Sequence, residues 1–170
     1  MLKKITNKNL LILLLAASLL ALTFVYISQY FFDLQPCLLC FYQRKPFLAI
    51  VAVASLTLTY FKSEKSKQIA LYFCTILLII NVALAFYHSG VERKFFRGPK
   101  TCSSEKLDGI SNLEELKEAL METKSIRCDE PSFVFLKLSM ANWNLLYCLA
   151  LLSYISFIRY KRHHPDATPL

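Results

Sequence analysis

Four apolar stretches, separated by polar segments, dominate this chain of 170 residues. A helix needs about 20 predominantly apolar residues, at about 1.5 Å each, to cross the hydrocarbon core of a bilayer. The stretches cover residues 10–30, 46–61, 69–87 and 142–160, the second being the shortest. Only 19% of the residues are charged, against about 25% in a typical soluble domain. The pattern predicts an all-α membrane protein, a four-transmembrane-helix bundle, with residues 1–170 forming one integral membrane domain.

The positive charges that flank these stretches predict the orientation of the chain. Short basic segments stay on the cytoplasmic side of a membrane. There are three such segments: one precedes the first stretch, one joins the second stretch to the third, and one follows the fourth. Their only acidic residues are Glu64 and Asp166. Their cations are Lys3, Lys4, Lys8, Lys62, Lys65, Lys67, Arg159, Lys161 and Arg162. We therefore expect both termini to be cytoplasmic, and two loops, residues 31–45 and 88–141, to face a periplasm or its equivalent.

The net charge of +8 does not indicate a nucleic-acid partner, because it lies in these short segments rather than on one face of a folded domain. The loop at 88–141 carries nine cations and nine acids, so it is neutral and free to be exported. The first apolar stretch has the basic start of a signal peptide but is long and lacks a convincing small-x-small cleavage site at its end. We expect it to be retained as a helix.

The second loop contains the pattern of a short amphipathic helix. Ser111 and Glu114 have the spacing of a capping box. Leu113, Leu116 and Leu120 then share one helical face, which predicts a helix lying on the bilayer surface or packed against the outer end of the protein.

Four of the six cysteines fall in the two loops, where an oxidising compartment lets disulfides persist. Cys37 and Cys40 form a close pair, and Cys102 and Cys128 form a wide pair. Two dithiols on the same side of a membrane, one of them beside the bilayer, suit the transfer of electrons from soluble thiols into the membrane. Cys74 and Cys148 lie within apolar stretches and are expected to be small buried hydrophobic residues.

The close pair has neighbours that favour redox chemistry. Its C-x-x-C spacing also occurs in half of a zinc site, but zinc would need four ligands. If a helix begins near the pair, Arg44 lies one turn after Cys40 on the same face. A cation there lowers a thiol pKa and makes the thiolate available. The alternative role for Arg44 is that of an ordinary interfacial anchor.

The wide pair has two possible roles. A disulfide between Cys102 and Cys128 would stabilise the fold by about 3 to 4 kcal/mol, because it restricts the conformations of the unfolded chain. That favours a structural staple. The polar flanks, which include Gly98 and Pro99, favour an exposed disulfide that exchanges with a partner protein.

The motifs around these cysteines resemble those of the disulfide bond formation protein B (DsbB) family of bacterial inner-membrane thiol oxidoreductases. The resemblance extends over nearly the whole chain and rests on five segments: PCLLCFYQR at 36–44, YHSGVE at 87–92, GPKTC at 98–102, CDEP at 128–131 and LSMANWN at 138–144. It implies a multi-pass inner-membrane protein that reoxidises a periplasmic DsbA-like dithiol oxidase. Its electrons would pass to a membrane quinone, either ubiquinone or menaquinone, and no metal is implied.

The resemblance also implies a role for each site residue. Cys40 would engage the quinone with Cys37 as its partner, and Cys102 would form the mixed disulfide with the soluble oxidase. Cys128 would then resolve that disulfide toward Cys37. Arg44 would stabilise the reduced quinone, and His88 would lie near the quinone ring; a helix-end cap or an interfacial position is the alternative for His88. Lys45, Phe96 and Lys137 depart from the family pattern without touching the cysteines.

Three other functions remain open from the sequence. The same chemistry run outward would reduce periplasmic disulfides. A metal-binding or transport protein would use the cysteines as ligands, but Asn81 is nearly the only polar residue at mid-membrane depth. A structural membrane protein with one staple would leave the position of Cys37 and Cys40 beside Arg44 without a reason.

Overall fold

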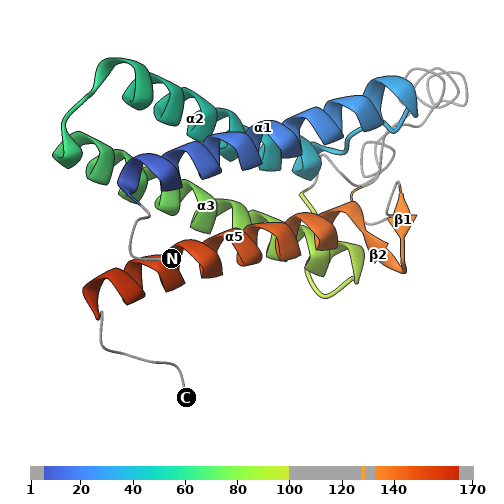
Figure 1. The fold of residues 1–170 in the computed structure, drawn as a ribbon. Helices are drawn as coiled ribbons and strands as arrows, with labels where there is room; N and C mark the ends of the chain where they lie inside the picture. The colour runs from blue at the N-terminus through green and yellow to red at the C-terminus, as the bar shows by residue number, and fades with distance from the viewer. Residues whose placement is uncertain (1–5, 100–127, 129–132, 165–170) are drawn as a thin grey trace, which may run out of the picture.

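A computed structural model of the chain describes residues 6–99, 128 and 133–164. Four long helices make up most of this part: α1 (Asn7–Phe31), α2 (Leu38–Tyr60), α3 (Glu64–Glu92) and α5 (Met140–His163), with the short strands β1 (Val134–Phe135) and β2 (Leu138–Ser139) before α5. All four helices are long and apolar enough to cross a membrane. Together they confirm the prediction of an all-α bundle with four membrane spans (Figure 1).

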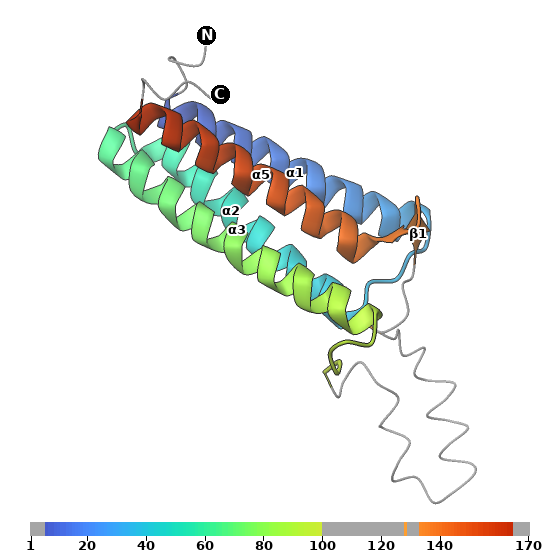
Figure 2. The ribbon, with the colours of Figure 1, turned by 90° about the horizontal axis from the view of Figure 1, so that it is seen from below.

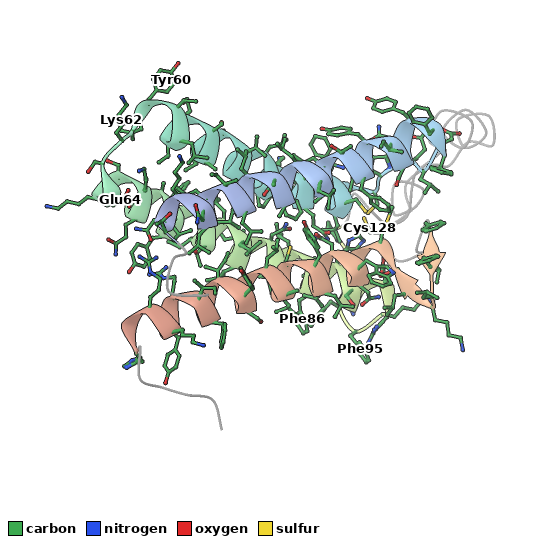
Figure 3. All side chains as sticks on the ribbon, viewed as in Figure 1. Tyr60, Lys62, Glu64, Phe86, Phe95 and Cys128 are labelled. Atoms are coloured by element: carbon green, nitrogen blue, oxygen red, sulfur yellow. The ribbon has the colours of Figure 1, made fainter. Side chains whose placement is uncertain are left out.

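Successive helices run in opposite directions along a common axis, as Figures 1 and 2 show. At one end, Arg162 Nη1 donates to Asn7 Oδ1 at 2.7 Å, joining the end of α5 to the start of α1. The α2–α3 turn, with Lys62 and Glu64, is at this end, and Cys128 is at the other (Figure 3). The basic segments described in the structure therefore share one end of the bundle. That this end faces the cytoplasm stays a prediction.

The helix α2 begins well before the apolar stretch predicted at Pro46. Cys37 is its N-cap residue, and the Cys37 sulfur accepts the backbone N–H of Cys40 at 3.3 Å. Pro46 thus lies inside the helix, which membrane helices tolerate because their neighbours can satisfy the freed backbone group. The early start places the C-x-x-C pair in the first turn of a spanning helix.

The bundle is apolar both inside and outside. Leu14, Ile50 and Leu78 are fully buried between helices, while side chains such as Leu20 and Phe86 are exposed on the outer surface. Figure 3 shows side chains projecting from all sides of the helices. Such an outer surface suits lipid tails, which are as apolar as a protein core.

A tight β-hairpin leads into α5. Its strands pair Val134 with Ser139 and Phe135 with Leu138, and its turn residues Leu136 and Lys137 have φ of 52° and 62°. Such left-handed positions favour glycine, so a glycine would adopt the backbone at Lys137 more readily than the lysine of this chain does. The helix predicted over 111–122 lies outside the described residues, as does Cys102.

Candidate redox site

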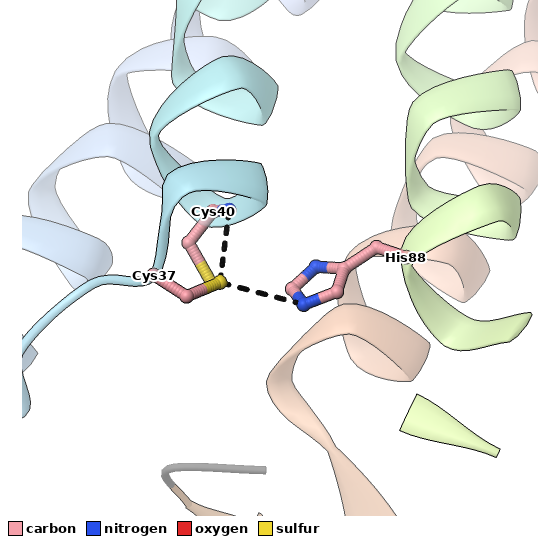
Figure 4. Close-up of side chains that lie close together, drawn as sticks. All are labelled: Cys37, Cys40 and His88. Atoms are coloured by element: carbon pink, nitrogen blue, oxygen red, sulfur yellow. Dashed lines mark hydrogen bonds between the residues drawn. The ribbon is translucent and has the colours of Figure 1, made fainter. Parts of the chain in front are cut away.

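The close cysteine pair meets α3 at the end of the bundle opposite the basic turns. The sulfurs of Cys37 and Cys40 are 3.1 Å apart, and both cysteines are free thiols. His88, in the last turns of α3, places its Nε2 3.5 Å from the Cys37 sulfur (Figure 4). Because Cys37 and His88 are both buried, this contact is shielded from water. The structure therefore brings Cys37, Cys40 and His88 together into one cluster.

The surroundings of Cys37 favour its thiolate. A hydrogen bond from the Cys40 thiol is the main cause of a pKa lowered well below the ordinary 9.0, and burial opposes it. The hydrogen bond and electrostatic attraction of His88, and the backbone N–H of Cys40, lower the pKa further. The positive end of the α2 helix dipole also stabilises a negative charge at Cys37, as it does for other reactive cysteines at helix N-termini. Cys37 is therefore the thiol of the pair that holds the negative charge.

We expect Cys37 in the reduced protein to react with iodoacetamide with a pH midpoint on the acid side of neutrality. A depressed pKa means that the thiolate persists as the pH falls below 9 and is lost only when the pH passes the folded-state pKa. Peptide mass spectrometry of protein alkylated between pH 4 and pH 9 measures this midpoint. A midpoint near 9 at Cys37 would contradict the assignment of the thiolate.

The side chain of Arg44 contacts two residues of α1. Its Nη1 donates to Gln29 Oε1 at 2.6 Å, and its guanidinium carbon is 5.3 Å from the centre of the Tyr26 ring. The side chain is buried, and its Nε has no hydrogen-bond partner among the residues that the structure describes. An anchor would place its charged head in water, so this geometry does not fit that alternative. The unpaired Nε is a donor left available inside the bundle.

Cys128 lies in the same buried cluster as Cys37, Leu39 and Val91. It is disulfide-bonded and only 1% exposed. The polar flanks of the wide pair favoured an exposed disulfide, whereas Cys128 is buried and packs against the close pair. Its role, as a staple or in exchange, stays a prediction. The predicted partner, Cys102, lies outside the described residues.

A polar network that the sequence did not predict holds the end of α3 against the start of α5. Glu92 Oε1 is 3.7 Å from His88 Nε2, and the other Glu92 oxygen accepts a hydrogen bond from Ser139. Asn142 Nδ2 donates to Ser139 Oγ at 2.8 Å, and Ser89 Oγ donates to Asn142 Oδ1 at 2.6 Å. The spacing of His88 and Glu92, four residues apart in a helix, was the available signal.

A second set of polar contacts reaches His88 from the opposite side. Gln43 Nε2 lies 2.8 Å from His88 Nδ1, and Asn144 Nδ2 donates to Gln43 Oε1 at 2.7 Å. Cys148 donates its thiol to Asn144 Oδ1 at 3.6 Å. The sequence prediction of Cys148 as a simple buried hydrophobic residue did not foresee this contact.

The cluster also has the composition of a partial metal site. The ligand atoms of Cys37, Cys40 and His88 lie within 4.8 Å of one another. A structural zinc site uses four ligands, and no fourth His, Cys, Asp or Glu joins this group among the residues that the structure describes. The two sulfurs are instead close enough to form a disulfide with a small movement. The arrangement suits thiol–disulfide chemistry better than metal storage.

Comparisons with known proteins agree with this chemistry. A family model described as disulfide bond formation protein DsbB matches residues 7–158. An uncharacterized protein from Rickettsia prowazekii (strain Madrid E), RP370, is 31% identical over 157 residues, which is 92% of this chain and 90% of the relative. No solved structure matches the chain.

Proposed function

We propose, since the chain belongs to the disulfide bond formation protein B family, that it carries electrons from a periplasmic thioredoxin-fold dithiol oxidase to a membrane quinone. The family makes this protein a multi-pass membrane oxidoreductase of disulfide bond formation. The DsbA-like partner, the quinone and the roles of individual residues are our proposal. The observation that carries it is the burial of disulfide-bonded Cys128 in one cluster with Cys37.

The outer exchange begins at Cys102. A partner thiolate attacks the Cys102 sulfur, forms a mixed disulfide and breaks the Cys102–Cys128 bond, releasing Cys128 as a thiolate. The burial of Cys128 supports this choice, because a folded partner cannot approach a sulfur that is 1% exposed. The second partner thiolate then displaces Cys102. The partner leaves oxidised, and the outer pair holds two electrons.

The inner exchange passes these electrons to the close pair. The Cys128 thiolate attacks Cys37 of the Cys37–Cys40 disulfide and releases Cys40 as a thiolate. Cys102 then attacks Cys128, which restores the outer disulfide and releases Cys37. The contacts that stabilise the Cys37 thiolate favour the reduced pair, and a stabilised reduced form makes a disulfide a stronger oxidant. This supports electron flow from the outer pair to the inner pair.

The residues around the close pair fit a quinone. A bound quinone would supply the acceptor for two electrons and two protons from the dithiol, whose two sulfurs would then re-form the Cys37–Cys40 disulfide. The unpaired Arg44 Nε, one helical turn after Cys40, is a donor suited to a quinone oxygen. His88 was predicted beside the quinone ring; its contact with Cys37 supports a role at the sulfur as well.

One reconstitution tests the proposal. The purified protein is mixed with a reduced thioredoxin-fold oxidase and either ubiquinone or menaquinone, and quinone absorbance is followed. We expect stoichiometric quinone reduction as the oxidase becomes oxidised, with the preferred quinone giving the faster rate. Reduction of an oxidised partner by quinol would show the reverse direction. If no electrons pass in either direction with either quinone, the proposal is overturned.

A further inference from the structure

The two side-chain amides beside His88 form an ordered chain across three helices. Asn144 on α5 donates to Gln43 on α2, and Gln43 contacts His88 on α3, with N–O and N–N distances of 2.7 and 2.8 Å. Gln43 is buried and His88 is 2% exposed, so water does not compete strongly for these groups. Cys148 ends the chain by donating to Asn144 Oδ1.

The direction of each hydrogen bond follows from amide chemistry. An amide nitrogen only donates and an amide oxygen only accepts. Since the Gln43 oxygen already accepts from Asn144, Gln43 presents its N–H to His88 Nδ1. That ring nitrogen must then be the acceptor. The proton of a neutral His88 therefore lies on Nε2, the atom that is 3.5 Å from the Cys37 sulfur.

We propose that Gln43 and Asn144 are positioning residues that hold the His88 proton on Nε2. The Nε2–H group then donates a hydrogen bond to the Cys37 thiolate. The role rests on the proposed function only in taking Cys37 as a reactive thiol. A proton on Nδ1 would face the Gln43 N–H. Relieving that conflict requires Gln43 to rotate its amide, and Asn144 must then rotate as well. The two amides thus resist the wrong tautomer together.

The ionisable groups near His88 leave this assignment to the amides. On α3, Glu92 lies near Nε2, the nitrogen that already carries the proton. On α2, Cys37 faces Nε2 as well, with Cys40 behind it. On α5, the ionisable side chain that takes part in this series of hydrogen bonds is Cys148. It contacts Asn144 rather than the His88 ring. Among these described contacts, Gln43 alone fixes Nδ1.

The direct test is the tautomer itself. The full-length reduced protein, labelled with 15N-histidine and held in nanodiscs, gives separate signals for protonated and unprotonated ring nitrogens. The spectrum of His88→Ala assigns His88 among the three histidines. We expect the wild type to carry its proton on Nε2. Gln43→Glu, which replaces the N–H donor with an acceptor, should bring a proton to Nδ1. A wild-type proton on Nδ1 would overturn the proposal.

A second variant gives an independent readout. Asn144→Leu frees Gln43 to rotate, so both tautomers should appear. The pH midpoint of Cys37 alkylation should rise by about one unit, which slows the reaction about tenfold on the acid side of the profile. Asn81→Leu removes another buried amide of the bundle, for which the described part of the chain offers no hydrogen-bond partner, and should change neither readout.

Folding and function are separated from the inference. Far-ultraviolet circular dichroism and thermal unfolding identify variants that fail to fold. If Gln43→Glu fails to fold, Asn144→Ala takes its place in the tautomer measurement. A purely structural role would lower the unfolding temperature while the tautomer and the midpoint stay as in the wild type, and this outcome refutes positioning. The wild-type protein could carry the His88 proton on Nε2 and yet transfer no electrons to quinone. That result would refute the proposed function and would support this inference.

Discussion

Replacing Cys40 with alanine abolishes electron transfer from the reduced partner to quinone and leaves the helix bundle intact. Without the Cys40 sulfur the close pair cannot form a disulfide, so it can neither accept electrons from Cys128 nor return to the oxidised state. Loss of a residue that forms the covalent intermediate costs on the order of 10⁴-fold or more in turnover. Quinone absorbance, followed with reduced oxidase in excess, measures the effect.

A matched control separates chemistry from packing. Cys74 is a fully buried free thiol on α3 that belongs to the central core. Cys74→Ala makes the same cysteine-to-alanine change at a different buried position of the bundle, and we expect it to keep near-normal turnover. A Cys40→Ala protein that is folded and still reduces quinone at the wild-type rate would end the proposed relay.

The helices could be predicted because the signal is contained in each segment. A stretch of apolar residues such as 10–30 needs no partner to be recognised as a span, since the bilayer sets its length. The start of α2 was harder, because Pro46 suggests a helix start and the polar residues before it suggest a loop. The Cys37 cap and the partners that Gln43 and Arg44 find inside the bundle extend the helix to Leu38.

The contacts within the site depend on packing between distant segments. The sequence predicted that a cation would follow Cys40 by one turn, but not that Arg44 would point to Gln29 on α1. Gln43 and Asn144 stand in the quoted motifs, yet their contact joins residues that are far apart in the chain. An isolated polar residue in a span identifies no partner until the neighbouring helices are placed.

Replacing Arg44 with methionine should raise the KM for quinone about tenfold or more while exchange with the partner oxidase proceeds. The reason is the unpaired Nε inside the bundle, since a charge-assisted hydrogen bond contributes about 1.5 to 3 kcal/mol. Steady-state quinone reduction at saturating oxidase gives KM and kcat. A single-turnover measurement of partner oxidation without quinone isolates the exchange steps.

The neighbouring cation supplies the control for Arg44. Lys45 is exposed, and its Nζ lies 4.5 Å from the centre of the Tyr42 ring, so Lys45→Met removes a charge from the same membrane depth without touching Gln29. We expect its KM to stay near that of the wild type. Arg44→Lys keeps the charge but loses Nε and the planar fork, so it should restore only part of the affinity. If Arg44→Met raised KM no more than Lys45→Met does, Arg44 would be a structural residue that joins α2 to α1.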